Sequence, residues 1–334
     1  MKHAIKSISV IGDGGWGTTL AIHLAKKGYD IVLWGAFADY VALTATAREN
    51  KKFLPGYKIP HNVFLTADIS VAIERGDLIV LACPSEYLIG TLIKIKNTDY
   101  PGKAFVSVIK GIDPLTFQRM SQVIHQHLGK IPLAVLSGPT IAAETAAGMA
   151  TTAVVACSDN SLAKTIQNVF NSPGFRIYTN PDVIGVEISG SLKNVIAIAC
   201  GICDGLGLGT NAKAAILTRG LVEMTHLAAV LGAKKETFYG LAGLGDLATT
   251  CFSPNSRNRT VGEALGKGKS ITSVLGGMPM VAEGVVTAKA VYLLSRKKNI
   301  SMPIVEQVYK IIFKHKNPRK AMADLMGRSL KSET

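Results

Sequence analysis

The sequence is short of cysteine, aromatic residues and acid. It has five cysteines, 6% aromatic residues, and 23 aspartates and glutamates against 37 lysines and arginines. A small, odd number of cysteines argues against a disulfide framework and is typical of a reducing compartment. Cys200 and Cys203 have the spacing of a redox or metal motif, but no second pair accompanies them. We therefore expect them to be buried in the core, and we expect no metal site.

Long hydrophobic runs are also missing. Glu187 and Lys193 interrupt the most apolar region, and the run 195–203 is shorter than the roughly 20 residues of a membrane span. Lys2 and Lys6 lead directly into the first expected strand, so we expect no signal peptide. These features predict a cytoplasmic protein without stable membrane insertion.

The shortage of acid leaves a net charge of +14, most of it after residue 251. Basic runs such as 296–298 are usually solvated faces, and neither interleaved aromatic residues nor a nucleic-acid motif accompanies them. A basic field also attracts small anions, including phosphorylated metabolites. We therefore expect a small anionic substrate and no nucleic acid. A dinucleotide sensor or nucleic-acid-binding protein without catalysis is the alternative.

What the sequence does have is a glycine loop in the right place. Gly12, Gly14, Gly15, Trp16 and Gly17 form a G-x-G-x-x-G motif between an apolar strand and a helix-like stretch. The first glycine suits a tight turn, the second a close approach of backbone to pyrophosphate, and the third the packing of helix on strand. A glycine-rich turn without a ligand is the competing interpretation. The context predicts a dinucleotide site.

The order of elements predicts an α/β fold in two domains, and 334 residues suffice for both. Short β-branched runs alternate with helix-like segments up to Pro181, and helices separated by glycine-rich breaks follow. We expect an N-terminal Rossmann-type, doubly wound, mainly parallel sheet (1–185) and a C-terminal all-α substrate domain (186–334). Expected strands are 8–11, 31–34, 63–65, 78–82, 104–109, 133–136, 152–156 and 176–178, and expected helices include 18–27, 85–95, 114–128 and 162–170.

The second expected strand ends without an acidic residue. An Asp or Glu there normally binds the adenosine ribose when NAD is preferred. The chain has Trp34-Gly35-Ala36-Phe37 at this point, so no charge at the strand end excludes a 2′-phosphate. NADPH and NADH are both open as cofactors.

Three polar groups in the second half could carry chemistry. Lys193 lies among apolar residues, where desolvation or the cation Lys110 would lower its pKa and suit it to exchange a proton with an alcohol or ketone. Asp246 follows a glycine-rich segment and could orient that lysine. The segment 256–258 offers clustered donors for a phosphate. A snorkelling lysine and a structural arginine in a capped loop are the alternatives.

Taken together, these stretches resemble the bacterial-type NAD(P)-dependent glycerol-3-phosphate dehydrogenases. The matching segments, in family order, are 12–18, 137–140, 180–186, 193–197, 240–247 and 256–259. The resemblance implies interconversion of sn-glycerol 3-phosphate and dihydroxyacetone phosphate, which supplies glycerophospholipid synthesis. It is also compatible with a homodimer. Asp13 and Ala36 depart from the family pattern, which leaves the preference between NADPH and NADH open.

The resemblance also implies roles for individual residues. Lys193 is expected to donate and accept the proton, and Lys110 to touch both cofactor and substrate. The other expected substrate contacts are Gly138, Thr140, Asp246, Ser256, Arg257 and Asn258. Expected cofactor contacts beyond the glycine loop are Ala142, Arg257, Val281 and Glu283. The 3-hydroxyacid dehydrogenases, which combine a similar fold with a lysine and a carboxylate substrate, are the alternative enzyme class.

Overall fold

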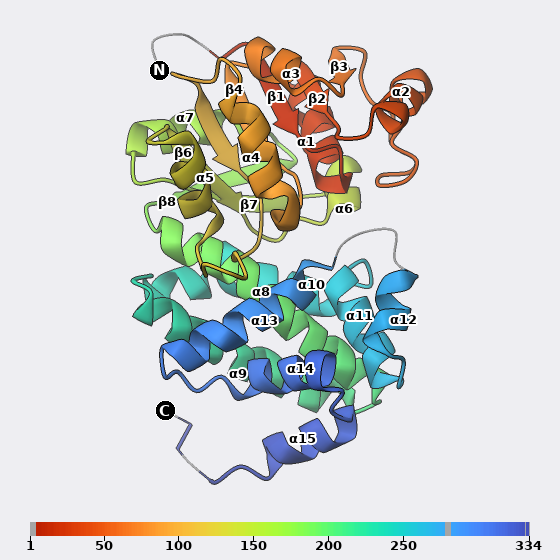
Figure 1. Cartoon of the computed structure of the whole chain (residues 1–334), viewed down its shortest axis with the longest axis vertical. Helices are drawn as coiled ribbons and strands as arrows, with labels where there is room; N and C mark the ends of the chain where they lie inside the picture. Colours follow the sequence, from red (N-terminus) through yellow and green to blue (C-terminus); the bar gives the residue numbers. More distant parts are fainter. Residues whose placement is uncertain (1–4, 278–281, 331, 334) are drawn as a thin grey trace.

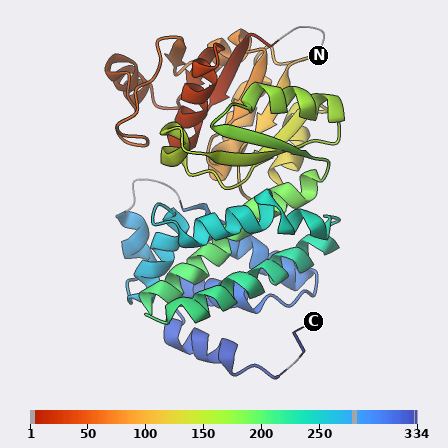
Figure 2. The ribbon, with the colours of Figure 1, turned by 180° about the vertical axis from the view of Figure 1, so that it is seen from behind.

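The computed structural model describes residues 5–277, 282–330 and 332–333. A sheet-based domain and a helical domain are stacked along the long axis of the molecule, and α8 leads from the first into the second (Figure 1). The N-terminus lies at the sheet end and the C-terminus at the helical end. The rear view shows the same two layers with the helical bundle below the sheet (Figure 2).

One eight-stranded sheet, in the order β3-β2-β1-β4-β5-β6-β7-β8, organises the first domain. Neighbouring strands are parallel, except that β6 and β7 are antiparallel. The strands are β1 (Ser7–Ile11), β2 (Asp30–Trp34), β3 (Val63–Thr66), β4 (Leu78–Leu81), β5 (Ala104–Ser107), β6 (Leu133–Ser137), β7 (Thr151–Ala156) and β8 (Phe175–Asn180). The strand order reverses between β1 and β4, so a ligand crevice is expected beyond their carboxyl ends. The predicted Rossmann-type, mainly parallel sheet is confirmed.

Helices cover both faces of this sheet. On one face lie α1 (Gly15–Lys26), α6 (Ala142–Ala146) and α7 (Asn160–Phe170), and on the other α3 (Ile69–Arg75), α4 (Leu88–Lys96) and α5 (Met120–Leu128). The remaining helices of this domain are α2 (Ala38–Ala47) and the short η1 (Ser85–Tyr87). Successive strand residues serve opposite faces, as the two-residue strand period requires: Val10 joins the first core and Ile11 the second.

The second domain is helical throughout its described residues. Its elements are α8 (Val183–Gly205), α9 (Gly209–Val230), η2 (Lys235–Tyr239), η3 (Leu241–Gly245), α10 (Asp246–Phe252), α11 (Arg257–Gly266), α12 (Ile271–Gly276), α13 (Glu283–Lys297), α14 (Pro303–Lys314) and α15 (Pro318–Met326). Glycines bring α8 and α11 into backbone contact, because a Cβ on Gly201 would collide with the Arg259 carbonyl oxygen and one on Gly262 with that of Ile198. This contact fixes α11 against the C-terminal half of α8.

The apolar helix α8 corrects one expectation from the sequence. By length and composition Val183–Gly205 does reach the range of a membrane span, with a mean hydropathy of 1.5 over its most apolar window. However, 89% of that window is buried inside the protein. Since α9, α10, α11 and α13 pack around α8, its apolar composition is that of a core helix.

The prediction of a helix over 114–128 was wrong in its first part. The helix α5 begins only at Met120. Before it, the Asp113 carboxylate accepts hydrogen bonds from the N–H groups of Leu115 and Thr116, and Phe117 has a φ of +61°. A side-chain-stabilised turn followed by a left-handed residue cannot continue into a helix.

Candidate active site

The three glycines of the G-x-G-x-x-G motif, Gly12, Gly14 and Gly17, have different surroundings. Gly12 has a φ of +127°, and a Cβ there would lie 2.7 Å from the Ala82 carbonyl carbon at the end of β4. A Cβ on Gly17 would collide with the Gly12 carbonyl oxygen, whereas nothing lies within 4 Å of a Cβ on Gly14. Gly12 and Gly17 therefore let the chain pack on itself, and Gly14 faces open space.

The N-terminus of α1 is suited to binding an anion. Its N-cap, Gly14, provides no side-chain cap, and its first turn contains no acidic residue. The backbone N–H groups of Gly15, Trp16 and Gly17 therefore lack intrahelical acceptors and carry the positive end of the helix dipole. Backbone donors beside open space fit the pyrophosphate of a dinucleotide.

Ala142 lies beside this loop, although it is far away in sequence. The Thr19 hydroxyl donates a hydrogen bond to the Ala142 carbonyl oxygen at 3.1 Å, and a Cβ on Gly15 would lie 3.8 Å from the Cβ of Ala142. The structure thus brings together the loop and the residue expected to contact the cofactor after β6.

Lys193, Asp246 and Lys110 form one cluster where the two domains meet. Asp246 Oδ1 pairs with Lys193 Nζ, and Asp246 Oδ2 lies 2.7 Å from Lys110 Nζ. Lys193 is 5% exposed and Asp246 is 1% exposed. One buried carboxylate therefore holds two ammonium groups, one from the end of the sheet and one from α8.

The environment of Lys193 tunes its proton affinity. Burial lowers the pKa of Lys193 to about 7, and the neighbouring Lys110 acts in the same direction, while Asp246 opposes the shift. An amine with this pKa exchanges protons readily near neutral pH. The expectation that desolvation would tune this lysine agrees with its position.

The residues that follow β6 lie beside this cluster. Lys110 Nζ donates to the Gly138 carbonyl oxygen at 3.3 Å, and the Thr140 hydroxyl donates to the same oxygen at 3.1 Å. Gly138 has a φ of +147°, and a Cβ there would lie 2.9 Å from Ala153 Cα. Gly138 and Thr140, the expected substrate contacts, thus lie next to Lys110.

The start of α11 carries the three residues expected to bind phosphate. Ser256 is its N-cap and accepts a hydrogen bond from the Arg259 N–H at 3.3 Å. Asn258 is buried and accepts a hydrogen bond from the Gly284 N–H at 3.0 Å, which ties α11 to the start of α13. A helix N-terminus with an adjacent arginine, Arg257, is a suitable phosphate site.

Glu283 lies among the cations of the cluster. Burial raises the pKa of Glu283, while Arg257, Lys110, Lys193 and the backbone N–H of Ser85 oppose the rise. Its carboxylate is therefore within electrostatic reach of three cations and contacts the loop that follows β4. Val281, the other late residue expected to contact the cofactor, lies outside the described residues.

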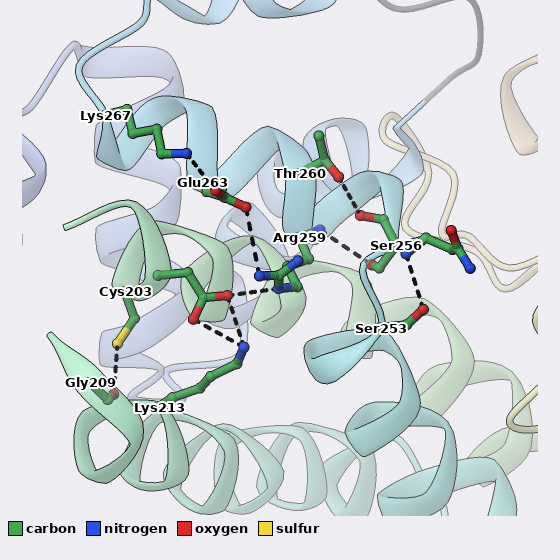
Figure 3. A network of polar contacts seen from close by, with 11 residues as sticks. Cys203, Gly209, Lys213, Ser253, Ser256, Arg259, Thr260, Glu263 and Lys267 are labelled. Carbon is green, nitrogen blue, oxygen red and sulfur yellow. Dashed lines mark hydrogen bonds and ion pairs between the residues drawn. The ribbon is translucent and has the colours of Figure 1, made fainter. Parts of the chain in front are cut away.

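A polar network behind α11 holds that helix in place (Figure 3). Asp204, at the end of α8, accepts hydrogen bonds from Lys213 at 2.8 Å and from Arg259 Nε at 2.7 Å. Arg259 also lies 3.6 Å from Glu263, which pairs with Lys267. Since Arg259 is two residues from Arg257, this network fixes the turn that carries the expected phosphate ligands.

Two polar residues at the site were missed in the sequence. Thr250 accepts a hydrogen bond from Lys193 Nζ at 2.8 Å and donates one to the Asp246 carbonyl oxygen at 2.7 Å. Its i, i+4 spacing from Asp246 on a helix was a usable signal. The Ser137 hydroxyl is buried near Gly190 and has no hydrogen-bond partner among the described residues. Its position just before Gly138 was a weaker signal.

Within the described residues, no group of His, Cys, Asp or Glu is arranged to hold a metal ion. All five cysteines are free and buried. The predicted core packing of Cys200 and Cys203 is confirmed.

Two family models together cover most of the chain. Residues 7–163 match the N-terminal part of NAD-dependent glycerol-3-phosphate dehydrogenase, and residues 182–323 match its C-terminal part. Among curated proteins, a glycerol-3-phosphate dehydrogenase [NAD(P)+] from Chlorobium limicola is 46% identical over 98% of this chain and 99% of its own length. One from Geobacter sulfurreducens is 47% identical over 98% of each chain.

A solved structure is similar over nearly the whole molecule. The crystal structure of a glycerol-3-phosphate dehydrogenase from Coxiella burnetii superposes with a TM-score of 0.94 at 37% identity. The match covers 96% of this chain and 99% of the Coxiella chain. The similarity therefore includes both domains.

Proposed function

Because the chain belongs to the NAD-dependent glycerol-3-phosphate dehydrogenase family, we propose that the cluster of Lys193, Asp246 and Lys110 is its catalytic centre. The enzyme interconverts dihydroxyacetone phosphate and sn-glycerol 3-phosphate with NAD(H) or NADP(H). This reaction typically supplies glycerophospholipid synthesis in the family. The observation that carries the proposal is a buried lysine paired to one buried aspartate where the two domains meet, a burial that lowers the pKa of the lysine.

Lys193 is the proposed proton donor and acceptor. Bound NAD(P)H supplies the hydride that reduces C2 of the ketone. Lys193 Nζ then gives a proton to the C2 oxygen, which becomes the hydroxyl of the product. In the opposite direction the neutral amine takes that proton back. Asp246 and Thr250 hold Nζ in one orientation for both steps.

Lys110 and the start of α11 are proposed to bind the ketone oxygen and the phosphate of the substrate, respectively. Lys110 places a positive charge where negative charge develops on the ketone oxygen, with Gly138 and Thr140 beside it. Ser256, Arg257 and Asn258 are proposed to hold the phosphate at the N-terminus of α11. The reacting carbon is then held between two fixed elements.

The cofactor residues are proposed from the contacts at the start of α1 and around the lysine cluster. The backbone N–H groups of Gly15, Trp16 and Gly17 would bind the pyrophosphate, while Gly12 and Gly14 would shape the loop and leave room for it. Ala142 lies beside them, and Lys110, Arg257 and Glu283 surround the place where cofactor and substrate would meet. Val281 is also proposed, from the family resemblance alone.

Further proposals concern the whole protein. We place the division between the cofactor-binding and substrate-binding domains at 185/186, three residues inside α8. We also propose that the enzyme is cytoplasmic, acts without nucleic acid or membrane insertion, and forms a homodimer. Light scattering of the purified protein tests the dimer, because a monomeric mass would contradict it.

Replacement of Lys193 tests the proposed catalytic role. We expect Lys193→Met to lower kcat about 1,000-fold, because loss of a positioned general acid typically costs two to four orders of magnitude. NADH binding, measured by nucleotide fluorescence, should stay within about twofold, since the glycine loop is untouched. Lys289→Met, at an exposed position of α13, is the matched control. A folded Lys193→Met enzyme with the parent turnover would remove Lys193 from the reaction.

Inhibition tests the substrate class. Inorganic phosphate and glycerol 3-phosphate should compete with dihydroxyacetone phosphate, because the proposed site at α11 recognises a phosphate. Short hydroxyacids should not compete, since a carboxylate does not reproduce that group. Competition by hydroxyacids alone would favour a hydroxyacid dehydrogenase.

A further inference from the structure

The adenosine end of the proposed cofactor crevice has an acidic side chain from an unexpected place. The usual acid at the end of β2 is missing, because Gly35, Ala36 and Phe37 follow Trp34. The carboxylate of Asp13 lies at this point instead. A Cβ on Gly35 would collide with Asp13 Oδ2 and lie 2.6 Å from Asp13 Cγ. The side chain of Asp13 therefore covers the end of β2 from within the glycine loop.

The pairing of β1 and β2 explains how a residue of the phosphate loop reaches this position. Ile11 is in register with Trp34, and the Gly12 N–H donates to the Trp34 carbonyl oxygen at 2.9 Å. Gly12 and Gly35 are therefore the first residues beyond the paired strands, and Asp13, one residue further on, extends its side chain to Gly35. Because Gly35 has no side chain, it leaves the room that the carboxylate fills.

The backbone of Asp13 is held from the other side. Its carbonyl oxygen accepts hydrogen bonds from Asn50 Nδ2 at 2.6 Å and from the Thr18 hydroxyl at 3.2 Å. Asn50 is fully buried and also donates to Thr18 Oγ1 at 2.8 Å. These hydrogen bonds fix the backbone from which the Asp13 side chain extends to Gly35.

From this geometry, and on the premise that the crevice binds the proposed cofactor, we propose that Asp13 makes the enzyme select NADH over NADPH. A carboxylate beside the ribose accepts a hydrogen bond from a free 2′-hydroxyl, as the acid at the end of β2 does in other dinucleotide folds. The same carboxylate repels a 2′-phosphate, which carries between one and two negative charges at neutral pH. Asp13 thereby discriminates between NADH and NADPH in place of the acid that is missing at the end of β2.

The basic residues that follow α2, Arg48 and Lys52, differ in what they could offer a 2′-phosphate. Burial raises the pKa of Asp13, and Lys52 is the cation that opposes the rise. Lys52 Nζ lies 4.9 Å from the ring centre of Phe53, on an exposed side chain. Arg48 donates its guanidinium hydrogens to the backbone carbonyl oxygens of Ile59, Pro60 and Val63. Lys52 is thus the cation whose attraction to a 2′-phosphate Asp13 must outweigh.

The test measures nucleotide binding without substrate. Dissociation constants of NADH and NADPH are determined by fluorescence or calorimetry for the parent enzyme, Asp13→Ala and Asp13→Ser, with thermal unfolding as a check on folding. The parent should bind NADH at least about tenfold more tightly than NADPH. Both variants should reduce this ratio by about tenfold, mainly by tightening NADPH binding. Asp13→Ser keeps a side chain that can bond the 2′-hydroxyl, so it should lose less NADH affinity than Asp13→Ala.

Asp39→Asn is the matched control, because it removes an exposed acidic charge from the first turn of α2, near the same end of the sheet. It should leave the NADH-to-NADPH ratio within about twofold. Equal affinity of the parent for both nucleotides would overturn the proposal, and so would variants that weaken both nucleotides equally. Either result would leave the reaction itself intact, whereas binding of neither nucleotide would contradict the proposed function as well.

Discussion

The two sides of the site are built by opposite means. On the sheet side, the loop provides backbone N–H groups at the start of α1 and open space at Gly14. On the helical side, Lys193 and Asp246 provide buried charge. The sheet side is one short segment whose backbone can approach the cofactor because its glycines have no side chains. The helical side depends on charged side chains that are far apart in the sequence. Damage to the first should therefore appear in cofactor binding, and damage to the second in turnover and its pH dependence.

Among variants that keep Lys193, the largest effect is expected on the charged side. We expect Asp246→Asn to lower kcat about 100-fold, because it removes the only carboxylate that pairs with both Lys193 and Lys110 among the described residues. The variant also loses the charge that raises the pKa of Lys193 against burial and Lys110. The pKa of Lys193 should therefore fall below its parent value of about 7.

The sign of the pH dependence follows from the protonation state that each direction requires. Ketone reduction needs the protonated amine, so its rate should fall as pH rises through about 7 in the parent and at lower pH in Asp246→Asn. Alcohol oxidation needs the neutral amine and should gain activity over the same ranges. Thr250→Val, which removes one hydrogen-bond acceptor of Nζ but no charge, is the control and should shift the profile much less. An unshifted profile in Asp246→Asn would separate this carboxylate from the titration of Lys193.

Substitutions on the sheet side should change cofactor binding only. We expect Gly14→Ala to raise the dissociation constant of NADH about tenfold or more while thermal stability stays unchanged, because the new Cβ meets no protein atom within 4 Å and fills the proposed ligand space. Calorimetric titration and a melting curve measure the two quantities. Gly90→Ala, an open position in α4, is the control and should leave binding unchanged. Equal NADH affinity in Gly14→Ala and the parent would place the pyrophosphate elsewhere.

The same contrast explains what the sequence could reveal. The glycine loop and the alternation of strands and helices are local patterns, so the Rossmann-type sheet and the helical second domain were predicted correctly. The helix boundary at Met120 was not, because it depends on the Asp113 turn and the left-handed Phe117. Local propensity alone does not place such a turn.

Contacts across the chain were less accessible to sequence reasoning. The pairs Lys193–Asp246 and Lys110–Asp246 span 53 and 136 residues. The types of these residues suggested that they act together, but their spacing in the sequence did not place them in contact. The contact of Asp13 with Gly35 depends on the register of β1 and β2, which the sequence does not specify. Side chains that meet across the fold therefore needed the structure.

The smallest effect is expected where charge supports the site from behind. Asp204→Asn removes the carboxylate shared by Lys213 and Arg259, and with it the tie between the end of α8 and the first turn of α11. We expect the KM for dihydroxyacetone phosphate to rise about three- to fivefold with kcat nearly unchanged, because the phosphate ligands lose position while Lys193 does not. Denaturant unfolding should show a loss of about 1–3 kcal/mol, in the range for a partly buried charged hydrogen bond. Glu263→Gln, at the more exposed end of the same network, should change both quantities less. A fall in kcat at constant KM would instead connect Asp204 to proton transfer by Lys193 and not to the position of the phosphate ligands.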